Sequence, residues 1–340
     1  LHRIPTRQPA VRWSVATEQP IFSSPALSNR GRLFVGSLDG ALYSVTVDGE
    51  LRWKRKLGRR IFASPALTPR GVVVGTDDDA VHMLDAETGE PRWRFELGPC
   101  PREQGFGPDS VQCDADSSVL VAPDDSLLFG GDRLYRLGLD GKQRGRTELP
   151  GHAFSSPTMG PDGSVYIGTQ GNVALALTAA GTLKWQLPAR YHFDSTAALV
   201  DEQTVVIGAD SGLVYALSTA DGAVKWKRRT YRPVRSSPAV DRRTGTVIIG
   251  SDSGRVHALD ARDGAVRWRF ETGGPVRSSP VVDPDGRVVF GSQDNHVYAL
   301  DDAGALLWRV ELGGDVDSSV AVGSRGLYVG CDDGNLYGIR

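Results

Sequence analysis

Eight residues of differing chemistry stand at one recurring position of this chain, each directly before a pair of small residues, as in FSSPAL and RSSPAV. Three are aromatic, three acidic and two basic: Phe22, Phe62, Asp116, Phe154, Asp194, Arg235, Arg277 and Asp317. Two arginines that converge can hold a carboxylate ligand through paired N–H groups. They can equally form ion pairs with Asp194 and Asp317, so the position indicates either a ligand site or an internal charge network.

Motifs of known catalytic machinery do not occur in the chain. There is no G-x-S-x-G, no H-E-x-x-H and no phosphate-binding loop. His82 and His257 take a position that tyrosine fills in other repeats, which favours packing over metal binding. The run 77–79 of three aspartates lacks calcium-ligand spacing and is interpreted as a solvated turn. We predict no catalytic residue and no metal site.

The chemically varied position recurs because the chain is built from a repeat. Its tryptophans are spaced by 40 to 42 residues, apart from one gap of 92: Trp13, Trp53, Trp93, Trp185, Trp226, Trp268 and Trp308. The long gap holds an insertion and one further repeat, whose tryptophan position has drifted, near Arg144. Self-similarity at this period indicates eight copies of one structural unit.

Each copy carries four segments with strand character. A small-residue segment is followed by an apolar segment ending in glycine, such as FVGS, by a segment such as LYSV, and by the tryptophan segment. Pairs such as Asp39-Gly40 supply the tight turns between them. Four-stranded antiparallel units in this number predict an all-β, eight-bladed β-propeller, with the small-residue strands crowded around its axis.

The two ends of the chain complement each other. The last repeat, 316–339, has three strands and no tryptophan strand, whereas the strand 11–15 contains Trp13 and lacks the other three. We predict that the N-terminal strand completes the last blade and removes an open sheet edge. The chain would then be a single domain over 1–340, with an insertion loop at 98–114 before the third blade.

The insertion and two other loops are expected on the same face as the varied position, which we call the top face. Cys100 and Cys113 flank the insertion; they predict a disulfide and an oxidising compartment, the alternative being two free thiols. Exposed aromatic and arginine side chains often dominate protein interfaces. The candidates on these loops are Phe106, Tyr191, His192, Tyr231 and Arg232.

Composition narrows the function further. The formal net charge of −2 argues against a nucleic-acid-binding protein. No apolar run is long enough to span a membrane. The chain begins at Leu1 and not at Met, which leaves open whether a signal segment has been removed.

Three segments carry a resemblance to a known family: MLDAETGEPRW (83–93), ALSTADGAVKW (216–226) and ALDARDGAVRW (258–268). They resemble the A-x-D-x-x-x-G-x-x-x-W motif of the PQQ-like, tryptophan-docking repeat. That family includes the quinoprotein dehydrogenases and the outer-membrane assembly lipoprotein BamB. The resemblance implies that the seven tryptophans dock between neighbouring blades.

The resemblance also suggests two possible functions, which the residues of this chain help to distinguish. Quinoproteins hold PQQ between a tryptophan and a disulfide of adjacent cysteines, beside calcium, and this chain has no adjacent cysteines. We therefore predict no cofactor, and a non-enzymatic, BamB-like scaffold that binds a protein partner through its top face. It would be a monomer in the periplasm or at the cell surface, lipid-anchored through a removed N-terminal segment. The alternative is a PQQ-dependent or other small-ligand enzyme or sensor that uses the channel mouth.

Overall fold

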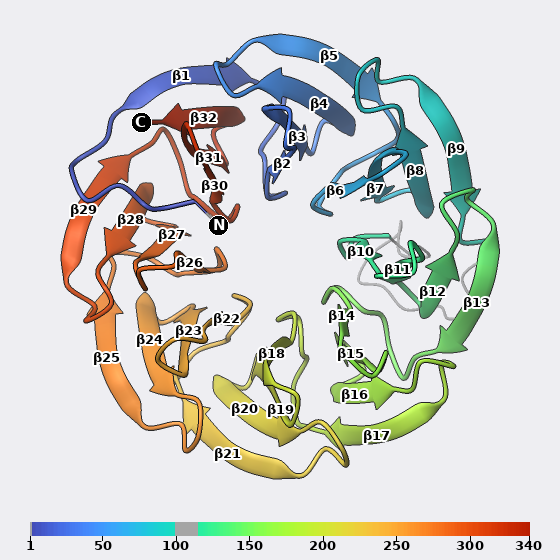
Figure 1. The fold of residues 1–340 in the computed structure, drawn as a ribbon, viewed down its shortest axis with the longest axis vertical. Helices are drawn as coiled ribbons and strands as arrows, with labels where there is room; N and C mark the ends of the chain where they lie inside the picture. Colours follow the sequence, from blue (N-terminus) through green and yellow to red (C-terminus); the bar gives the residue numbers. More distant parts are fainter. Residues whose placement is uncertain (1, 99–114) are drawn as a thin grey trace.

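A computed structural model describes residues 2–98 and 115–340 of the chain. Within these residues, 32 strands form eight four-stranded antiparallel sheets arranged as blades around a central axis (Figure 1). This confirms the prediction of an all-β, eight-bladed propeller. Blades 1 to 8 are counted from β2 onwards, and the strands of each blade are called A to D from the axis outwards.

The strands of each class occupy equivalent places in the eight blades. Strands A are β2 (Ala26–Leu27), β6 (Ala66–Thr68), β10 (Leu120–Val121), β14 (Thr158–Met159), β18 (Ala198–Asp201), β22 (Ala239–Asp241), β26 (Val281–Val282) and β30 (Ala321–Gly323). Strands B are β3 (Arg32–Gly36), β7 (Gly71–Thr76), β11 (Leu127–Gly130), β15 (Val165–Thr169), β19 (Thr204–Ala209), β23 (Thr246–Ser251), β27 (Val288–Ser292) and β31 (Gly326–Gly330). Strands C are β4 (Ala41–Thr46), β8 (Ala80–Leu84), β12 (Arg133–Leu137), β16 (Val173–Leu177), β20 (Leu213–Ser218), β24 (Arg255–Asp260), β28 (His296–Leu300) and β32 (Asn335–Ile339). Strands D are β5 (Leu51–Lys56), β9 (Pro91–Glu96), β13 (Gln143–Glu148), β17 (Leu183–Pro188), β21 (Val224–Arg229), β25 (Val266–Glu271), β29 (Leu306–Glu311) and β1 (Val11–Ala16).

Strands A are shorter than the small-residue segments of the sequence. In blade 1 the segment 22–27 is a strand only over Ala26–Leu27. The residues before it are held by a side chain: the Ser23 hydroxyl accepts from the N–H of Gly36 at 2.9 Å and donates to its carbonyl at 2.8 Å. A serine thus replaces ladder hydrogen bonds beside Pro25, which has no N–H to donate.

A closed ring of hydrogen bonds links the eight blades at the axis. In each blade the hydroxyl of the second small residue accepts, at 2.9–3.1 Å, from the backbone N–H of its counterpart in the neighbouring blade. The ring consists of Ser24, Ser64, Ser118, Ser156, Thr196, Ser237, Ser279 and Ser319. These bonds satisfy N–H groups that no sheet partner reaches, so the small residues also bind the blades together.

Strands B and C supply the core, which lies between neighbouring blades. Every residue of β7 is buried, and so is every residue of β8. Each apolar cluster joins two blades; the one at the closure joins Leu33 and Val35 of blade 1 to Tyr328 and Leu336 of blade 8. Because each blade is buried on both faces, its B and C strands appear in the sequence as continuous apolar runs. They do not alternate regularly between apolar and polar residues.

All seven tryptophans make the same contact with the next blade. Each indole N–H donates to a backbone carbonyl at 2.6–3.3 Å, and six of the acceptors lie in the C–D turn of the following blade: Val47, Ala86, Leu139, Thr219, Ala261 and Asp302. The ring fits against a turn glycine; a Cβ on Gly49, which has φ +90°, would lie 2.6 Å from Trp13. Both the donor and the glycine are therefore required at these positions.

Blade 3 lacks this tryptophan contact. The third residue of β13 is Gly145, so glycine and not Arg144 occupies the tryptophan position. No heavy atom lies within 4 Å of a Cβ placed there. The opposing turn is held instead by Thr147, whose hydroxyl donates to the Gly181 carbonyl at 3.0 Å.

The N-terminal strand closes the ring, as predicted. β1 pairs antiparallel with β32, with Ser14 opposite Tyr337 and Ala16 opposite Asn335. The seventh tryptophan, Trp308 of blade 7, donates to the carbonyl of Pro5 at 2.6 Å. Residues just before β1 thus replace the C–D turn that blade 8 lacks, because its strands C and D come from opposite ends of the chain.

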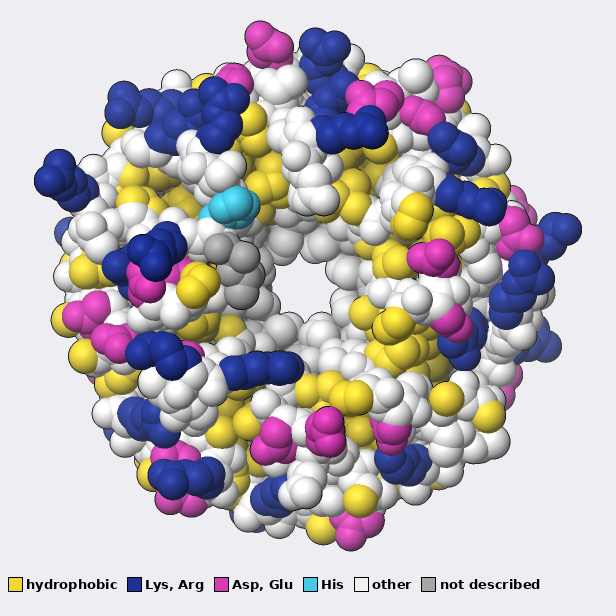
Figure 2. All heavy atoms as spheres, in the orientation of Figure 1, with side chains coloured by type: hydrophobic (Ala, Val, Ile, Leu, Met, Phe, Trp, Pro, Cys, Tyr) yellow, Lys and Arg dark blue, Asp and Glu magenta, His cyan; other side chains and the backbone are white. Residues whose placement is uncertain are grey.

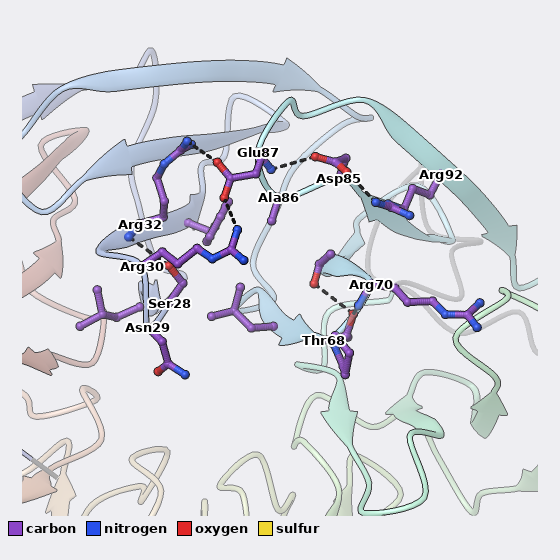
Figure 3. Close-up of a pocket in the computed structure, with 15 residues that line it drawn as sticks. Ser28, Asn29, Arg30, Arg32, Thr68, Arg70, Asp85, Ala86, Glu87 and Arg92 are labelled. Carbon is purple, nitrogen blue, oxygen red and sulfur yellow. Dashed lines mark hydrogen bonds and ion pairs between the residues drawn. The ribbon is translucent and has the colours of Figure 1, made fainter.

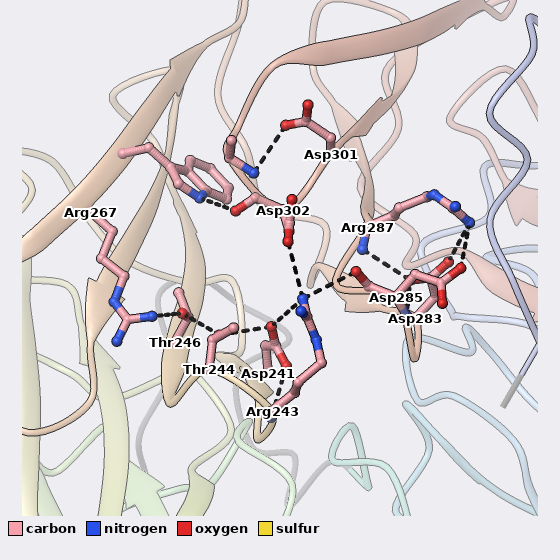
Figure 4. Close-up of polar contacts among 12 residues, drawn as sticks. Asp241, Arg243, Thr244, Thr246, Arg267, Asp283, Asp285, Arg287, Asp301 and Asp302 are labelled. Carbon is pink, nitrogen blue, oxygen red and sulfur yellow. Dashed lines mark hydrogen bonds and ion pairs between the residues drawn. The ribbon is translucent and has the colours of Figure 1, made fainter.

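Polar contacts fix the same N-terminal segment to blade 7. Asp283 accepts from the N–H of Ile4 at 2.9 Å, and Arg287 donates to the Ile4 carbonyl at 3.2 Å. Figure 4 shows Arg287 beside Asp283 and Asp285, and Arg243 of blade 6 bonded to Asp302 of blade 7. Ile4 itself is buried in the apolar cluster of blades 7 and 8.

Candidate functional site

Backbone hydrogen bonds define the top face. In blades 1, 2 and 4 to 8, the loop that leads into strand A accepts from the B–C turn of the same blade, as in Asp210 N–H to the His192 carbonyl and Asp252 N–H to the Pro233 carbonyl, both at 2.9 Å. The D–A loops and B–C turns of these blades therefore share one face, and the residues before the small pairs lie on it. Figure 2, which views the opposite face, shows that the channel is open along the axis.

Aromatic residues occupy one sector of this face. The rings of Phe22 and Phe62, from blades 1 and 2, stack with centroids 5.9 Å apart and planes 10° apart. In blade 4, His152 packs edge-on against Phe154 at 4.7 Å. Burial lowers the pKa of His152 to about 4, so this imidazole is neutral at physiological pH.

Charged residues occupy the sector formed by blades 5 to 8. Arg235 contacts Asp210 at 3.3 Å and Asp252 at 3.4 Å, and Arg277 contacts Asp252 at 3.2 Å. The predicted ion pairs of these arginines with Asp194 and Asp317 are therefore wrong. The B–C turns put Asp210 and Asp252 nearer to the guanidinium groups than the neighbouring strand starts do.

Sequence reasoning missed Asp210 and Asp252, although a signal was present. Both follow a strand B that ends in glycine, in GAD and GSD, and the B–C turns were already expected on the top face. Because both arginines have carboxylate partners within the propeller, a carboxylate ligand would have to displace those partners. The channel mouth is thus internally paired, at least at Arg235 and Arg277.

The two aspartates of the predicted pairs have other surroundings. Burial raises the pKa of Asp194, and the negative charge of Asp210 adds to this. Burial also raises the pKa of Asp317, although a hydrogen bond from the Gln293 amide, 3.0 Å from both carboxylate oxygens, partly offsets it. Asp116 holds the equivalent position in blade 3. Carboxylates outnumber cations at this part of the mouth.

Asp332, in the B–C turn of blade 8, titrates near neutral pH. Burial, followed by the charges of Asp317 and Asp315, raises its pKa to about 7, and its Oδ1 has no hydrogen-bond partner. An aspartate in an unfolded chain has a pKa of about 3.9. The folded protein therefore binds more protons than the unfolded chain between these two values, and its stability falls as the pH rises through that window.

We expect Asp332→Asn to raise the melting temperature by about 2 °C near pH 8, where wild-type Asp332 is charged, and to leave it unchanged near pH 4. Differential scanning calorimetry at both pH values measures this. The matched control is Asp333→Asn, which replaces one of the two carboxylate oxygens that accept from the Tyr337 hydroxyl and the Asn335 N–H by an NH2 group and should lower the melting temperature. A lower melting temperature of Asp332→Asn near pH 8 would contradict the assignment.

Three consecutive D–A loops expose aromatic side chains. Phe154 is 37% exposed, Tyr191 46% and Tyr231 71%, on the loops leading into blades 4, 5 and 6. The other large exposed apolar residues of the described chain each begin a strand D: Val11, Leu51, Leu183, Val224 and Leu306. The aromatic ones are therefore concentrated on one part of the top face.

Some of the other predicted residues lie near these aromatic side chains, and others lie in the loop outside the described residues. Arg232 is exposed next to Tyr231, and His192 is half-buried next to Tyr191. Phe106 and the predicted Cys100–Cys113 bridge lie outside the described residues. His82 and His257 are buried in strands C, where burial lowers the pKa of each to about 4.

Comparison with known proteins decides the family. A family model described as outer membrane protein assembly factor BamB matches residues 4–114, 81–250 and 234–340, which together span almost the whole chain. The chain belongs to the BamB family. A search of curated proteins finds no match.

Solved structures similar to this BamB-family chain share its fold at low sequence identity. BamB from Moraxella catarrhalis is 19% identical with a TM-score of 0.77, over 98% of this chain and 99% of that one. A europium-containing methanol dehydrogenase is 14% identical with a TM-score of 0.77, over 97% and 86%. The computationally designed Ika8 protein is 16% identical with a TM-score of 0.76, over 95% and 96%. The fold is thus common to an assembly factor, an enzyme and a design.

The opposite face of this BamB-family propeller has a groove of about 500 Å3 between blades 1 and 2. Its rim is charged, but the charges are paired: Arg30 and Arg32 both contact Glu87, and Arg92 contacts Asp85 (Figure 3). Across that face cations and carboxylates are intermixed (Figure 2). The groove is a weaker candidate than the top face because its guanidinium groups are largely neutralised.

Between residues 2–98 and 115–340, no group of three or more His, Cys, Asp or Glu side chains is arranged to hold a metal ion. The same ranges contain no helix long and apolar enough to cross a membrane.

Proposed function

We propose that this chain is a non-enzymatic, extracytoplasmic scaffold that binds a protein partner through the top face of its propeller. Membership in the BamB family supports a protein-binding role outside the cytoplasm. The observation that carries the proposal is the sector of exposed aromatics on consecutive loops, Phe154, Tyr191 and Tyr231. Loops on a rigid scaffold often carry function, and exposed aromatics supply much of the energy at protein interfaces.

Site-specific photo-cross-linking in the native host tests this proposal. A photoreactive amino acid at position 191 or 231 should yield one cross-linked protein, which mass spectrometry identifies. Leu183 and Leu306 are comparably exposed at 56% and 47% but lie on strands D, so they serve as matched control positions. Equal cross-linking at all four positions, or none at 191 and 231, would contradict a top-face interface.

Once the partner is identified, its affinity for a variant with Phe154→Ser, Tyr191→Ser and Tyr231→Ser should fall by at least about tenfold. Circular dichroism of the same variant would confirm that the propeller is intact, since all three side chains are exposed. An unchanged affinity would place the interface elsewhere on the molecule.

PQQ-dependent catalysis at the channel mouth is the competing function, because a methanol dehydrogenase shares the fold. We expect neither binding of PQQ with calcium nor dye-linked alcohol oxidation. Arg235 and Arg277, the cations available for a tricarboxylate, already pair with Asp210 and Asp252. All seven tryptophans lie on the outer strands D, with their indole N–H groups bonded to backbone carbonyls, so none is placed at the channel mouth to stack on the cofactor.

Isothermal titration calorimetry with PQQ and calcium, followed by an alcohol oxidation assay, measures this expectation. Micromolar or tighter binding with turnover would overturn the scaffold proposal. Binding without turnover that is lost in an Arg235→Ala, Arg277→Ala variant would indicate a ligand-sensing propeller instead.

A further inference from the structure

The outer strands of blades 1 and 5 have similar sequences but differ in how their cations are paired. β5 reads LRWKRK and β21 reads VKWKRR, and both lie at the rim of the propeller (Figure 1). Three cations of β21 are exposed: Lys225, Lys227 and Arg229. Lys225 lies at a register shift of the strand, whereas Lys227 and Arg229 are alternate residues of its regular part, about 6.6 Å apart.

Two cations of β5 have carboxylate partners within the propeller. Lys54 lies 2.5 Å from Glu18 and 3.4 Å from Asp39, and Arg55 lies 2.5 Å from Glu90. Other strands D are similar: Arg144 pairs with Asp140, and Arg267 with Asp260. Four of them also end in a glutamate: Glu96, Glu148, Glu271 and Glu311.

The cations of β21 have no such partners. Lys225 bonds the Thr204 hydroxyl at 2.8 Å and Arg228 the Gly264 carbonyl at 2.6 Å, which are neutral acceptors. Among residues 2–98 and 115–340, no carboxylate lies within ion-pair distance of Lys227, Arg229 or Arg232. All three are exposed. β21 ends in Arg229 where β25 of the next blade ends in Glu271, so the acid that would balance this row is missing.

Tyr231 extends this line in an unusual conformation. Its φ of 73° lies in the left-handed region, which is unfavourable for a bulky residue. Its side chain is 71% exposed, and it makes no ring contact or hydrogen bond with any described residue. The same place in the following D–A loop is taken by Gly273. Strained, exposed residues of this kind occur preferentially where a protein contacts another molecule.

We propose that β21 and the loop after it bind an acidic, extended segment of a partner protein. Side chains of an extended chain that face one way recur at the same spacing as Lys227 and Arg229, so alternate acidic residues would meet these two cations in register. β21 is the last strand of its sheet and pairs only with β20, so its outer edge is open to a further strand. Tyr231 and Arg232 would contact an aromatic or acidic residue at one end of that segment.

The narrowness of the charged line favours a peptide over other anions. On one side, Lys184 of β17 pairs with Asp162; on the other, β25 carries Glu271. An anionic membrane would need a broad cationic surface. Nucleic-acid binding usually accompanies a basic excess, whereas this chain has a formal net charge of −2. A line one strand wide fits a single extended chain.

This inference goes beyond the proposed top-face scaffold, because β21 belongs to the rim and its binding can be measured without the native partner. The probe is a labelled synthetic peptide with aspartate or glutamate at alternate positions and a terminal phenylalanine, titrated with the full chain by fluorescence anisotropy. We expect binding that weakens with added salt, and none with a peptide in which lysine replaces the acids.

The variant pair compares matched positions of the two strands. Lys227→Glu with Arg229→Glu should lower peptide affinity by about tenfold or more. Lys54→Glu with Lys56→Glu, the equivalent pair on β5, should leave it unchanged, and the melting temperatures of both variants verify folding. Equal losses in both variants would overturn the proposal. So would tighter binding of anionic vesicles or single-stranded DNA than of the peptide, if the β21 substitutions abolished it.

Tyr231→Gly separates a binding role from a structural one. Because glycine tolerates a positive φ, this substitution should leave the melting temperature unchanged or higher while lowering peptide affinity several-fold. A lower melting temperature with unchanged affinity would contradict a binding role for Tyr231.

Discussion

Deletion of residues 1–16 is expected to abolish the folded, monomeric propeller. The deletion removes β1, exposes the edge of β32 and leaves Trp308 without its acceptor, the Pro5 carbonyl. It also removes Trp13, which stacks on Tyr328 at 5.9 Å and donates to Val47 of blade 1 at 3.1 Å. Blade 8 would then contact blade 1 through its inner strands and through Arg325 and Arg340, which bond Asp48 of blade 1. A sheet edge exposed in this way promotes aggregation.

Size-exclusion chromatography, far-UV circular dichroism and thermal denaturation measure this expectation. Deletion of residues 1–2 is the matched control, because it leaves Ile4, Pro5 and β1 in place and should have little effect. A peptide of residues 1–16 added to the truncated chain should restore the monomer, since the strand needs only to pair with β32 and cover blade 7. A truncated protein that stays monomeric at an unchanged melting temperature would contradict closure by β1.

Trp308→Ala is expected to have the largest effect among single substitutions, a loss of about 3–5 kcal/mol of unfolding free energy. The Trp308 side chain is 2% exposed, packs in a cluster with buried Ile4, and donates to the Pro5 carbonyl at 2.6 Å. The substitution leaves a cavity and an unpaired carbonyl at the point where the two ends of the chain meet. Other tryptophans contact a continuous turn, whereas this one holds a free chain end.

Urea denaturation of the wild type and four variants measures this coupling. Trp268→Ala is the control, because its indole makes the equivalent bond to Asp302 but is more exposed, and it should cost less. Deletion of residues 1–9 combined with Trp308→Ala should cost less than the sum of the two separate changes, because both remove the same contact. Full additivity would show that Trp308 does not act through the N-terminal segment.

The repeat is the part of the fold that the sequence determines. Each copy carries its own turn residues and its own strand pattern, and seven of the eight carry a tryptophan, so local chemistry repeats wherever the pattern repeats. Closure by β1 was equally predictable, because a missing strand at one end matches a surplus strand at the other. The tryptophan position of the third blade was harder to assign. In a strand without a tryptophan, the pattern alone does not show whether Arg144 or the adjacent Gly145 occupies that position.

The partners of the charged residues were decided by the tertiary structure alone. Arg235 and Arg277 stand at equivalent points of the repeat, and nothing in the linear order distinguishes Asp194 or Asp317 from Asp210 or Asp252 as their partners. The choice follows from how far each B–C turn projects over the channel, which depends on the packing of whole blades. The same holds at the rim, where β5 and β21 are nearly alike in sequence. On β5, Glu18 and Asp39 pair with Lys54, and Glu90 pairs with Arg55. No carboxylate of the described residues lies within ion-pair distance of Lys227 or Arg229 on β21.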